Sequence, residues 1–352
     1  MHPPHLPPKS CSVPFYKKLR LVESILFMTV LSFISGLVGG IVSTVYIIPE
    51  YDVNTGLIRG QRVVTKTVAE SAPDPLFVRE QYRRVLSLVP KTLYDNTGYV
   101  PLDATVSAVL LTDTGWFVAS LPAGGVQATQ WVAVTSDGEE HLIKTVVVDG
   151  ARGLFYGLLD GSGFRVVTFP GLDALDAGTD VWLATHGTLD RSTLVYPTIS
   201  KEIEKTYSPG EPAYTFSLSN SVLPGTVVWT SDGKFFGFVN SMGGITPWYV
   251  IQSVYTNVFT DKVLVRNVLP VHGHVVSLPE SESARVGGRY GFYIERVDPR
   301  AQMIKKGDAI VQLEGNPLVP WTLEARILLH QGDQIPVTVL RDSDLIEMQL
   351  DV

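Results

Sequence analysis

The sequence predicts a mainly β protein preceded by one transmembrane helix, and three observations point to this architecture. Residues 21–48 form a long apolar run. The body after it consists of short segments rich in Val, Leu, Thr and aromatic residues, which Asp-Gly and Gly-Gly turns separate. Helical patterns are few in this body. Hydrophobic residues make up 45% of the 352-residue chain and charged residues 18%, which favours sizeable cores over disorder.

The apolar run 21–48 is the clearest single feature. After Glu23 it carries no charge until Glu50, so it exceeds the ~20 residues that a helix needs to cross a bilayer. It is also longer than the ~7–15 apolar residues of a signal peptide. Basic residues precede the run and acidic residues follow it, so the positive-inside rule places the N-terminus in the cytoplasm and the body outside. The basic residues are Lys17, Lys18 and Arg20.

Several classes of function are disfavoured by composition. The formal net charge is -7, and the basic residues of the tail leave an acidic body, which is a poor match for nucleic acid. The single cysteine, Cys11, permits no intramolecular disulfide. The seven histidines form no HExxH or CxxC-like pattern, so the sequence predicts no metal site and no cofactor. Ser32, Gly36 and Gly40 form a small-residue stripe that leaves helix–helix dimerisation open.

The body reads as a series of hairpins. The turns 135–138 and 230–233 both contain Ser-Asp-Gly between strand-like runs, and their glycines supply the positive φ that such turns need. Hairpins at this spacing from about residue 82 to 250 predict antiparallel barrels. The best helical segments are 252–262 and 322–332. Residues 50–80 are polar and irregular, which is typical of a stalk.

The order of these segments resembles that of the HtrA-like trypsin-fold serine proteases. Segments that carry the resemblance are LLTDTGWFVAS (110–120), VTSDGEEHLIKTVVVD (134–149), LDALDAGTDVWLATHG (172–187), SNSVLPGTVVWTSDGKFFGFVNS (219–241) and PWYVIQSVYTNVFTDKVLV (247–265). The resemblance implies a chymotrypsin-like double β-barrel followed by a C-terminal PDZ-like α+β domain. The expected divisions are a cytoplasmic tail at 1–20, the transmembrane helix at 21–48, a stalk at 49–80, the barrels at 81–262 and the PDZ-like domain at 263–352.

The resemblance also implies where a catalytic triad belongs, and the required residues are missing. The family's histidine position falls on Pro122, its aspartate position on Gly153 and its serine position on Pro224. A serine needs a histidine to accept its proton and an aspartate to orient that histidine. Neither proline nor glycine supplies these groups, so the sequence predicts a pseudoprotease. A shift in register would restore Ser219 or Ser221, but no histidine lies between His5 and His141.

The C-terminal part keeps more of the family pattern. GFYIERVDP (291–299) and KKGDAIVQLEGNPL (305–318) resemble the PDZ core, and 322–332 resembles the helix beside the groove. A PDZ domain binds a C-terminal peptide by strand addition. The resemblance places the carboxylate loop at 271–275, before the first strand. The predicted peptide-binding residues are His272, Gly273, His274, Val275, Ile327 and Leu328.

Three functions remain open at this stage. The preferred hypothesis is a non-catalytic, membrane-tethered scaffold that captures peptide or protein C-termini at the outer face of the membrane. A divergent, active envelope protease with relocated catalytic residues is the alternative, so enzymatic activity is uncertain and is disfavoured. A third hypothesis is an assembly module whose groove is closed and whose body only oligomerises. The family often trimerises, so a homo-oligomer is among the options that the resemblance implies.

Overall fold

The computed structural model describes residues 74–93, 105–122, 125–185, 188–199, 206–211, 213–301 and 303–352. The chain divides into two compact units, residues 1–71 and 72–352, and all of the described residues belong to the second. The predicted transmembrane helix at 21–48 and the tail before it lie outside the described residues. Within the described ranges, no helix combines the length and the apolar character that crossing a membrane requires.

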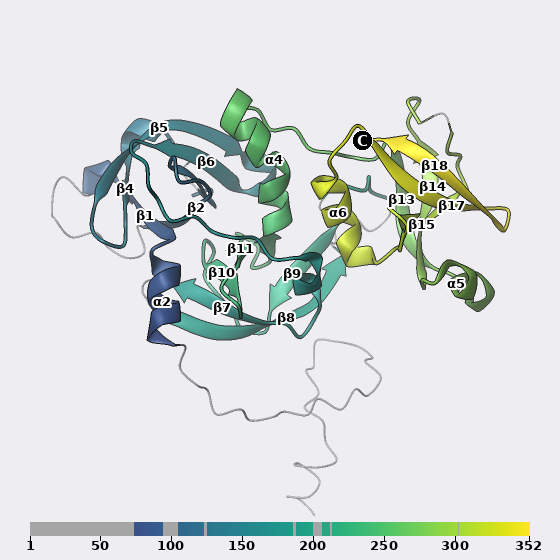
Figure 1. The fold of residues 1–352 in the computed structure, drawn as a ribbon, viewed down its shortest axis with the longest axis horizontal. Helices are drawn as coiled ribbons and strands as arrows, with labels where there is room; N and C mark the ends of the chain where they lie inside the picture. The colour runs from purple at the N-terminus through teal and green to yellow at the C-terminus, as the bar shows by residue number, and fades with distance from the viewer. Residues whose placement is uncertain are drawn as a thin grey trace, which may run out of the picture. The chain divides into compact units, whose positions relative to one another are not determined.

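Two closed six-stranded β-barrels occupy the first part of the second unit (Figure 1). The strand order is β1-β2-β3-β6-β5-β4 in the first barrel and β10-β11-β12-β9-β8-β7 in the second. The first contains β1 (Val85–Pro90), β2 (Val106–Leu110), β3 (Trp116–Ser120), β4 (Trp131–Val134), β5 (Glu140–Asp149) and β6 (Leu154–Leu159). The second contains β7 (Asp180–Thr185), β8 (Thr188–Ile199), β9 (Tyr214–Leu218), β10 (Val227–Thr230), β11 (Phe235–Val239) and β12 (Ile245–Pro247). The prediction of a mainly β double barrel is confirmed.

Both predicted hairpins with Ser-Asp-Gly turns are present. β4 pairs with β5 and β10 pairs with β11, each in antiparallel fashion. The turns between them place Gly138 at φ 84° and Gly233 at φ 78°, a backbone region that side chains with a Cβ rarely occupy. The two Ser-Asp-Gly segments therefore form turns for the reason that the sequence indicates.

A separate six-stranded sheet follows the barrels. Its order is β13-β14-β15-β17-β18, with β16 paired to β15, and neighbouring strands run antiparallel. The strands are β13 (Val271–Ser277), β14 (Tyr290–Val297), β15 (Ala309–Leu313), β16 (Asn316–Pro317), β17 (Gln334–Arg341) and β18 (Asp344–Asp351). The short helix α5 (Glu280–Val286) connects β13 to β14. This sheet does not close, so no further strand of the sheet pairs with β13 on the side away from β14.

Helices complete the unit. The two predicted helices are present as α4 (Trp248–Asp261) and α6 (Pro320–Leu329). The irregular stalk expected up to residue 80 is wrong at its C-terminal end, where α2 spans Pro75–Tyr82. The Asp74 carboxylate accepts a hydrogen bond from the Leu76 N–H at 2.9 Å and caps this helix. Phe77 of α2 packs against Trp182 of β7, with ring centroids 6.2 Å apart.

Helix α6 is buried on two faces. Ala325 and Leu328 belong to the hydrophobic cluster of the barrels and α4. Leu323 and Ile327 belong to the cluster of the C-terminal sheet. α6 therefore joins the two parts of the unit through apolar contacts, and Figure 1 shows it between the barrels and the sheet.

Candidate functional site

The loops that carry the three predicted triad positions meet in the structure. The Leu121 N–H, just after β3, donates to the Gly153 carbonyl at 2.8 Å. A Cβ placed on Gly225 would lie 3.9 Å from the Ser120 Cβ, so the loop of the second barrel reaches the same strand end. These contacts bring together the loops of Pro122, Gly153 and Pro224. The assignment of these residues to triad positions stays a prediction.

Two backbone amides of the loop between β9 and β10 are engaged in hydrogen bonds within the barrel. The Gly225 N–H donates to the Val239 carbonyl at 2.7 Å, and the Thr226 N–H donates to the Leu223 carbonyl at 3.3 Å. The Thr226 hydroxyl donates to the same Leu223 carbonyl at 2.8 Å. An oxyanion hole consists of N–H groups that point at the substrate carbonyl. These two amides are already used within the barrel, so they cannot stabilise an oxyanion in this conformation.

Ser219 and Ser221, the alternative nucleophiles, differ in their surroundings. The Ser219 hydroxyl lies 3.1 Å from the Ser192 hydroxyl and accepts the Thr193 N–H at 3.2 Å. It also donates to the Asn220 side-chain oxygen at 3.2 Å. None of these partners is a base that could activate the hydroxyl. Ser221 is exposed. Ser219, just after β9, is therefore bonded to the middle of β8 and is poorly placed to act as a nucleophile.

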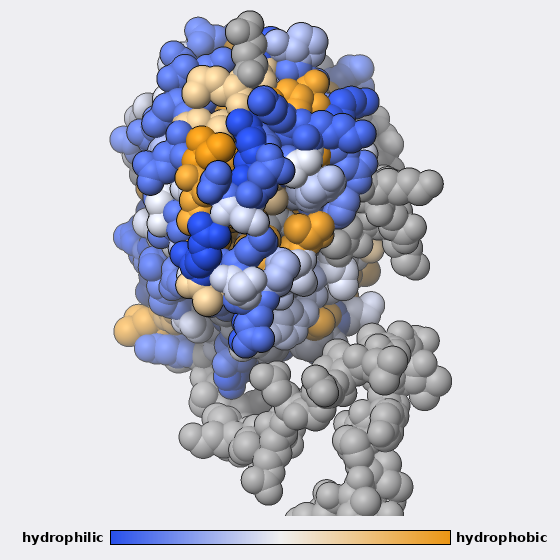
Figure 2. All heavy atoms as spheres, turned by 90° about the vertical axis from the view of Figure 1, so that its right-hand side faces the viewer, coloured by the Kyte–Doolittle hydropathy of each residue, from blue (hydrophilic) through white to orange (hydrophobic). Residues whose placement is uncertain are grey.

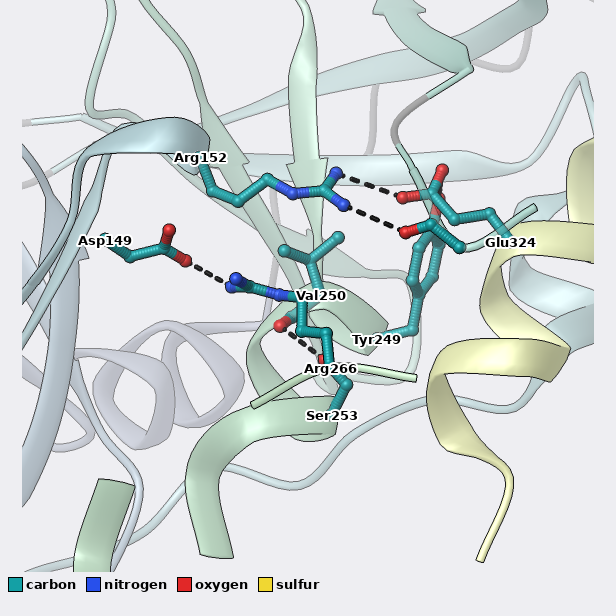
Figure 3. Close-up of polar contacts among 8 residues, drawn as sticks. Asp149, Arg152, Tyr249, Val250, Ser253, Arg266 and Glu324 are labelled. Atoms are coloured by element: carbon teal, nitrogen blue, oxygen red, sulfur yellow. Dashed lines mark hydrogen bonds and ion pairs between the residues drawn. The ribbon is translucent and has the colours of Figure 1, made fainter. Parts of the chain in front are cut away.

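Two charged residues near the predicted aspartate position form ion pairs with distant parts of the chain (Figure 3). Arg152 ends the short 3-10 helix η4 (Gly150–Arg152). Its guanidinium donates to Glu324 Oε1 of α6 at 3.0 Å and to the Gly210 carbonyl at 3.2 Å. Asp149, at the end of β5, forms an ion pair with Arg266. The loop that would carry a catalytic aspartate in a protease thus attaches α6 and two connecting segments to the first barrel.

Glu324 is the most perturbed acid of this cluster. It is 4% exposed, and this burial raises the pKa of its carboxyl from the usual 4.5 to about 7, although Arg152 and the Tyr249 hydroxyl act in the opposite direction. The Tyr249 hydroxyl donates to Glu324 Oε2 at 3.3 Å. Burial also raises the pKa of Tyr249. Glu324 therefore changes its protonation state near neutral pH.

The predicted carboxylate loop is a strand. Residues 271–275 lie within β13, which pairs with β14 along its length, for example through Val275 opposite Phe292. A Cβ on Gly273 would lie 1.8 Å from the Tyr293 carbonyl oxygen, so only glycine allows the two strands to approach this closely. His272 and His274 flank this glycine and are partly buried. Their role in binding a peptide stays a prediction.

The free edge of β13 carries an extended segment of the chain itself. The Tyr207 N–H donates to the Gly273 carbonyl at 2.9 Å, and the Gly273 N–H donates to the Tyr207 carbonyl at 3.0 Å. These two bonds define an antiparallel bridge. Tyr207 lies in the connection between β8 and β9 of the second barrel. The edge of β13 can therefore accept a strand, and the sequence pattern alone did not reveal which segment lies there.

The two predicted groove residues of α6 lie in different environments. Ile327 is fully buried in the cluster of the C-terminal sheet, which also contains Tyr207. Leu328 is 3% exposed and packs with the barrels instead. The structure thus brings Ile327, but not Leu328, together with the β13 edge.

A serine, a histidine and an aspartate also meet at this edge. The Ser208 hydroxyl lies 2.8 Å from His272 Nδ1, and His272 Nε2 lies 3.6 Å from Asp298 Oδ1. Ser208 is 4% exposed. Sequence analysis missed this trio because its members are far apart in the chain and only one of them, His272, was singled out.

The described ranges contain no group of three or more His, Cys, Asp and Glu side chains that could hold a metal ion.

Arg341 binds Asp308 through two hydrogen bonds of 2.8 and 2.7 Å. This pair and a hydrogen bond to the Lys305 N–H lower the pKa of Asp308 despite its burial. Its role is therefore to hold the turn before β15 against β17.

Replacement of Glu324 by Gln tests the buried carboxyl. Because the folded state raises its pKa, stability from this group is fully present below pH 4.5 and is lost as the pH rises through about 7. Between pH 4.5 and 8 we expect the free energy of unfolding of the wild type to fall by up to about 3 kcal/mol relative to Glu324→Gln. Urea unfolding of both proteins across this range measures the difference. A difference that does not change with pH would contradict the assignment.

Comparisons with known proteins return solved structures of low similarity. No protein-family model matches the chain, and no curated protein sequence matches it. Among solved structures, an HtrA-type protease AlgW with a decapeptide aligns with a TM-score of 0.46 and 17% identity, over 78% of this chain and 96% of that one. A serine endoprotease from Yersinia pestis aligns with a TM-score of 0.42 and 16% identity, over 78% and 95%. At these identities the likeness concerns the fold alone.

Proposed function

We propose that the protein is a non-catalytic, membrane-tethered peptide-binding protein with an HtrA-like fold. In this proposal the C-terminal sheet with α6 is a PDZ-like domain, and a partner segment adds as a strand along β13. The observation that carries the proposal is the pair of hydrogen bonds between Tyr207 and Gly273, because it demonstrates an edge that takes an extended segment. These two bonds involve backbone atoms only, so they do not depend on the partner's side chains.

The loss of catalytic groups supports the non-catalytic part. Pro122, Gly153 and Pro224 carry no nucleophile, base or acid, and the amides of Gly225 and Thr226 are engaged within the barrel. A barrel pair without these groups serves as a rigid support for the sheet that follows it. The apolar run 21–48 and the basic residues before it support the tether, with the body at the outer face of the membrane.

A serine hydrolase is the second candidate, because the Ser208 hydroxyl contacts one ring nitrogen of His272 and the other ring nitrogen approaches Asp298. Two features disfavour it. The Ser208 hydroxyl is almost completely buried, so a substrate carbonyl has no access in this conformation. In addition, 3.6 Å between His272 and Asp298 is too long for the hydrogen bond that orients a catalytic histidine.

Strand addition is tested by a proline at the β13 edge. Gly273 faces the edge with both its N–H and its carbonyl, so alternation along the strand directs the Val275 N–H to the same side. Val275→Pro removes this donor without removing a bond to β14. For peptides selected from a random library with the full chain, we expect about tenfold weaker binding to Val275→Pro. Val275→Ala is the matched control and should bind within about threefold of the wild type, because only side-chain packing changes. Equal affinity of all three proteins would place the peptides elsewhere.

Active-site labelling separates the two candidates. A fluorophosphonate reacts only with an activated serine, so the full chain should remain unlabelled under conditions that label an active serine protease completely. The variants Ser208→Ala, Ser219→Ala and Ser221→Ala serve as controls. Stoichiometric labelling that one of these substitutions abolishes would identify a nucleophile and overturn the non-catalytic proposal.

A further inference from the structure

The segment on the β13 edge, Thr206–Glu211, is held by more than one bridge. Besides the two bonds between Tyr207 and Gly273, the Leu269 N–H donates to the Pro209 carbonyl at 3.0 Å. The segment therefore runs antiparallel to the chain from Leu269 to Gly273, over the part of the sheet that the proposed function assigns to a partner. It occupies the same backbone donors and acceptors that a partner strand requires.

Tyr207 anchors the segment by its side chain. It is 5% exposed and lies in the hydrophobic cluster of the C-terminal sheet with Ile327 of α6. Its ring meets Phe292 edge-to-face, with centroids 5.2 Å apart. The aromatic side chain thus packs in the same core cluster as residues of α6 and β14.

The residues after Tyr207 make specific polar contacts. The Ser208 hydroxyl lies 2.8 Å from His272 Nδ1, and the Ser208 N–H donates to Glu211 Oε2 at 3.1 Å. Gly210 has φ 106°, and a Cβ there would lie 2.5 Å from the Asn267 carbonyl oxygen. Its own carbonyl accepts the Arg152 guanidinium at 3.2 Å. The sequence Tyr-Ser-Pro-Gly thus fits this site residue by residue.

The charge at the end of the segment distinguishes between two kinds of ligand. A C-terminal carboxylate at the position of Gly210 would be held by free backbone N–H groups or by an unpaired positive charge. The guanidinium of Arg152 is already matched by the buried Glu324 at 3.0 Å. It offers Gly210 a hydrogen bond to a neutral carbonyl, which any residue within a chain can provide. The contacts at Pro209 and Gly210 are therefore ones that residues within a chain can make.

We propose that Thr206–Glu211 is an internal ligand that closes the β13–α6 groove, and that a partner opens it by supplying a like segment. This proposal rests on the proposed function, since it names the ligand of that same groove. The ligand class is an extended internal segment of a protein, with an aromatic residue followed by a small hydroxyl residue and proline. Its first position fills the Tyr207 site, its second binds His272, and its third bonds to Leu269. Competition with the tethered segment keeps affinity low until that segment leaves.

The face of the molecule around the sheet agrees with a ligand of this kind. Figure 2, which views the side at the right of Figure 1, shows small groups of hydrophobic residues within a mostly hydrophilic surface. A partner that binds there gains little from broad apolar contact. One buried aromatic anchor and a short run of backbone hydrogen bonds suffice for recognition by strand addition.

The test uses a fluorescein-labelled synthetic peptide with the sequence of residues 204–212 (EKTYSPGEP), titrated against the full chain by fluorescence anisotropy. Tyr207→Ala weakens the tethered segment, so this variant should bind the peptide at least about tenfold more tightly than the wild type. Tyr196→Ala, which truncates a tyrosine of β8 that is 62% exposed, should bind as the wild type does. The same peptide with Ala in place of its tyrosine should lose binding to every protein.

The outcomes separate the two proposals. Equal affinity for the wild type and Tyr207→Ala, with loss in Val275→Pro, keeps the groove as a peptide site but overturns the internal ligand. No binding to any variant at millimolar peptide overturns the internal ligand as well. The proposed function then fails only if the random library also yields no binder. Ser208→Ala removes only the contact to His272, so it tests the proposal even if Tyr207→Ala fails to fold. This variant should bind the peptide about threefold more tightly than the wild type, or more. Unchanged affinity in this variant, measured on a folded protein, contradicts the proposal.

Discussion

An open β-sheet leaves one row of backbone donors and acceptors unpaired at each edge, and this constraint governs the C-terminal part of the molecule. The two barrels avoid it, because each of their six-stranded sheets closes on itself. The sheet that begins with β13 does not close. Gly273 presents both of its backbone groups at that edge, and Tyr207 satisfies both. The connection between β8 and β9 thus provides the neighbouring strand segment that β13 lacks. This pairing joins the second barrel to the sheet.

The buried pair of Arg152 and Glu324 fixes the surroundings of this edge. Arg152 belongs to the first barrel, Glu324 to α6, and Gly210 to the internal segment, so one guanidinium orders three parts of the unit. A buried ion pair often adds little net stability but makes the removal of one partner costly. Its contribution here is to set the position of α6 relative to the groove. Arg152 lies next to Gly153, the position where the resemblance expects a catalytic aspartate.

Local patterns in the sequence were sufficient to predict the barrels and helices α4 and α6. The Ser-Asp-Gly turns that contain Gly138 and Gly233 favour hairpins through local backbone conformation alone. Two further elements also have local signals in the sequence. Asp74 and Pro75 form a helix cap and first turn, which marks the start of α2. Val271, Gly273 and Val275 alternate with histidines, which is the period of a strand rather than that of a loop.

The internal ligand could not be predicted from the sequence in the same way. Ser208 and His272 are 64 positions apart, and nothing in the composition of residues 206–211 names a partner strand. The separation of Ile327 from Leu328 likewise depends on α6 having two buried faces, whereas a groove helix has one. Long-range pairing of this kind is a property of the assembled sheet edge. The third hypothesis from the sequence was a module with a closed groove. In our proposal the segment Thr206–Glu211 closes the groove, and a partner segment can replace it.

Amide hydrogen exchange on the full chain tests the central claim most directly. In the free protein, the amides of Tyr207 and Gly273 should both be protected, because each donates to the other residue's carbonyl. On addition of a peptide that binds the groove, the Tyr207 amide should lose protection while the Gly273 amide keeps it, since the peptide replaces only the internal strand. Protection of Tyr207 that persists when the groove peptide is bound would contradict the account.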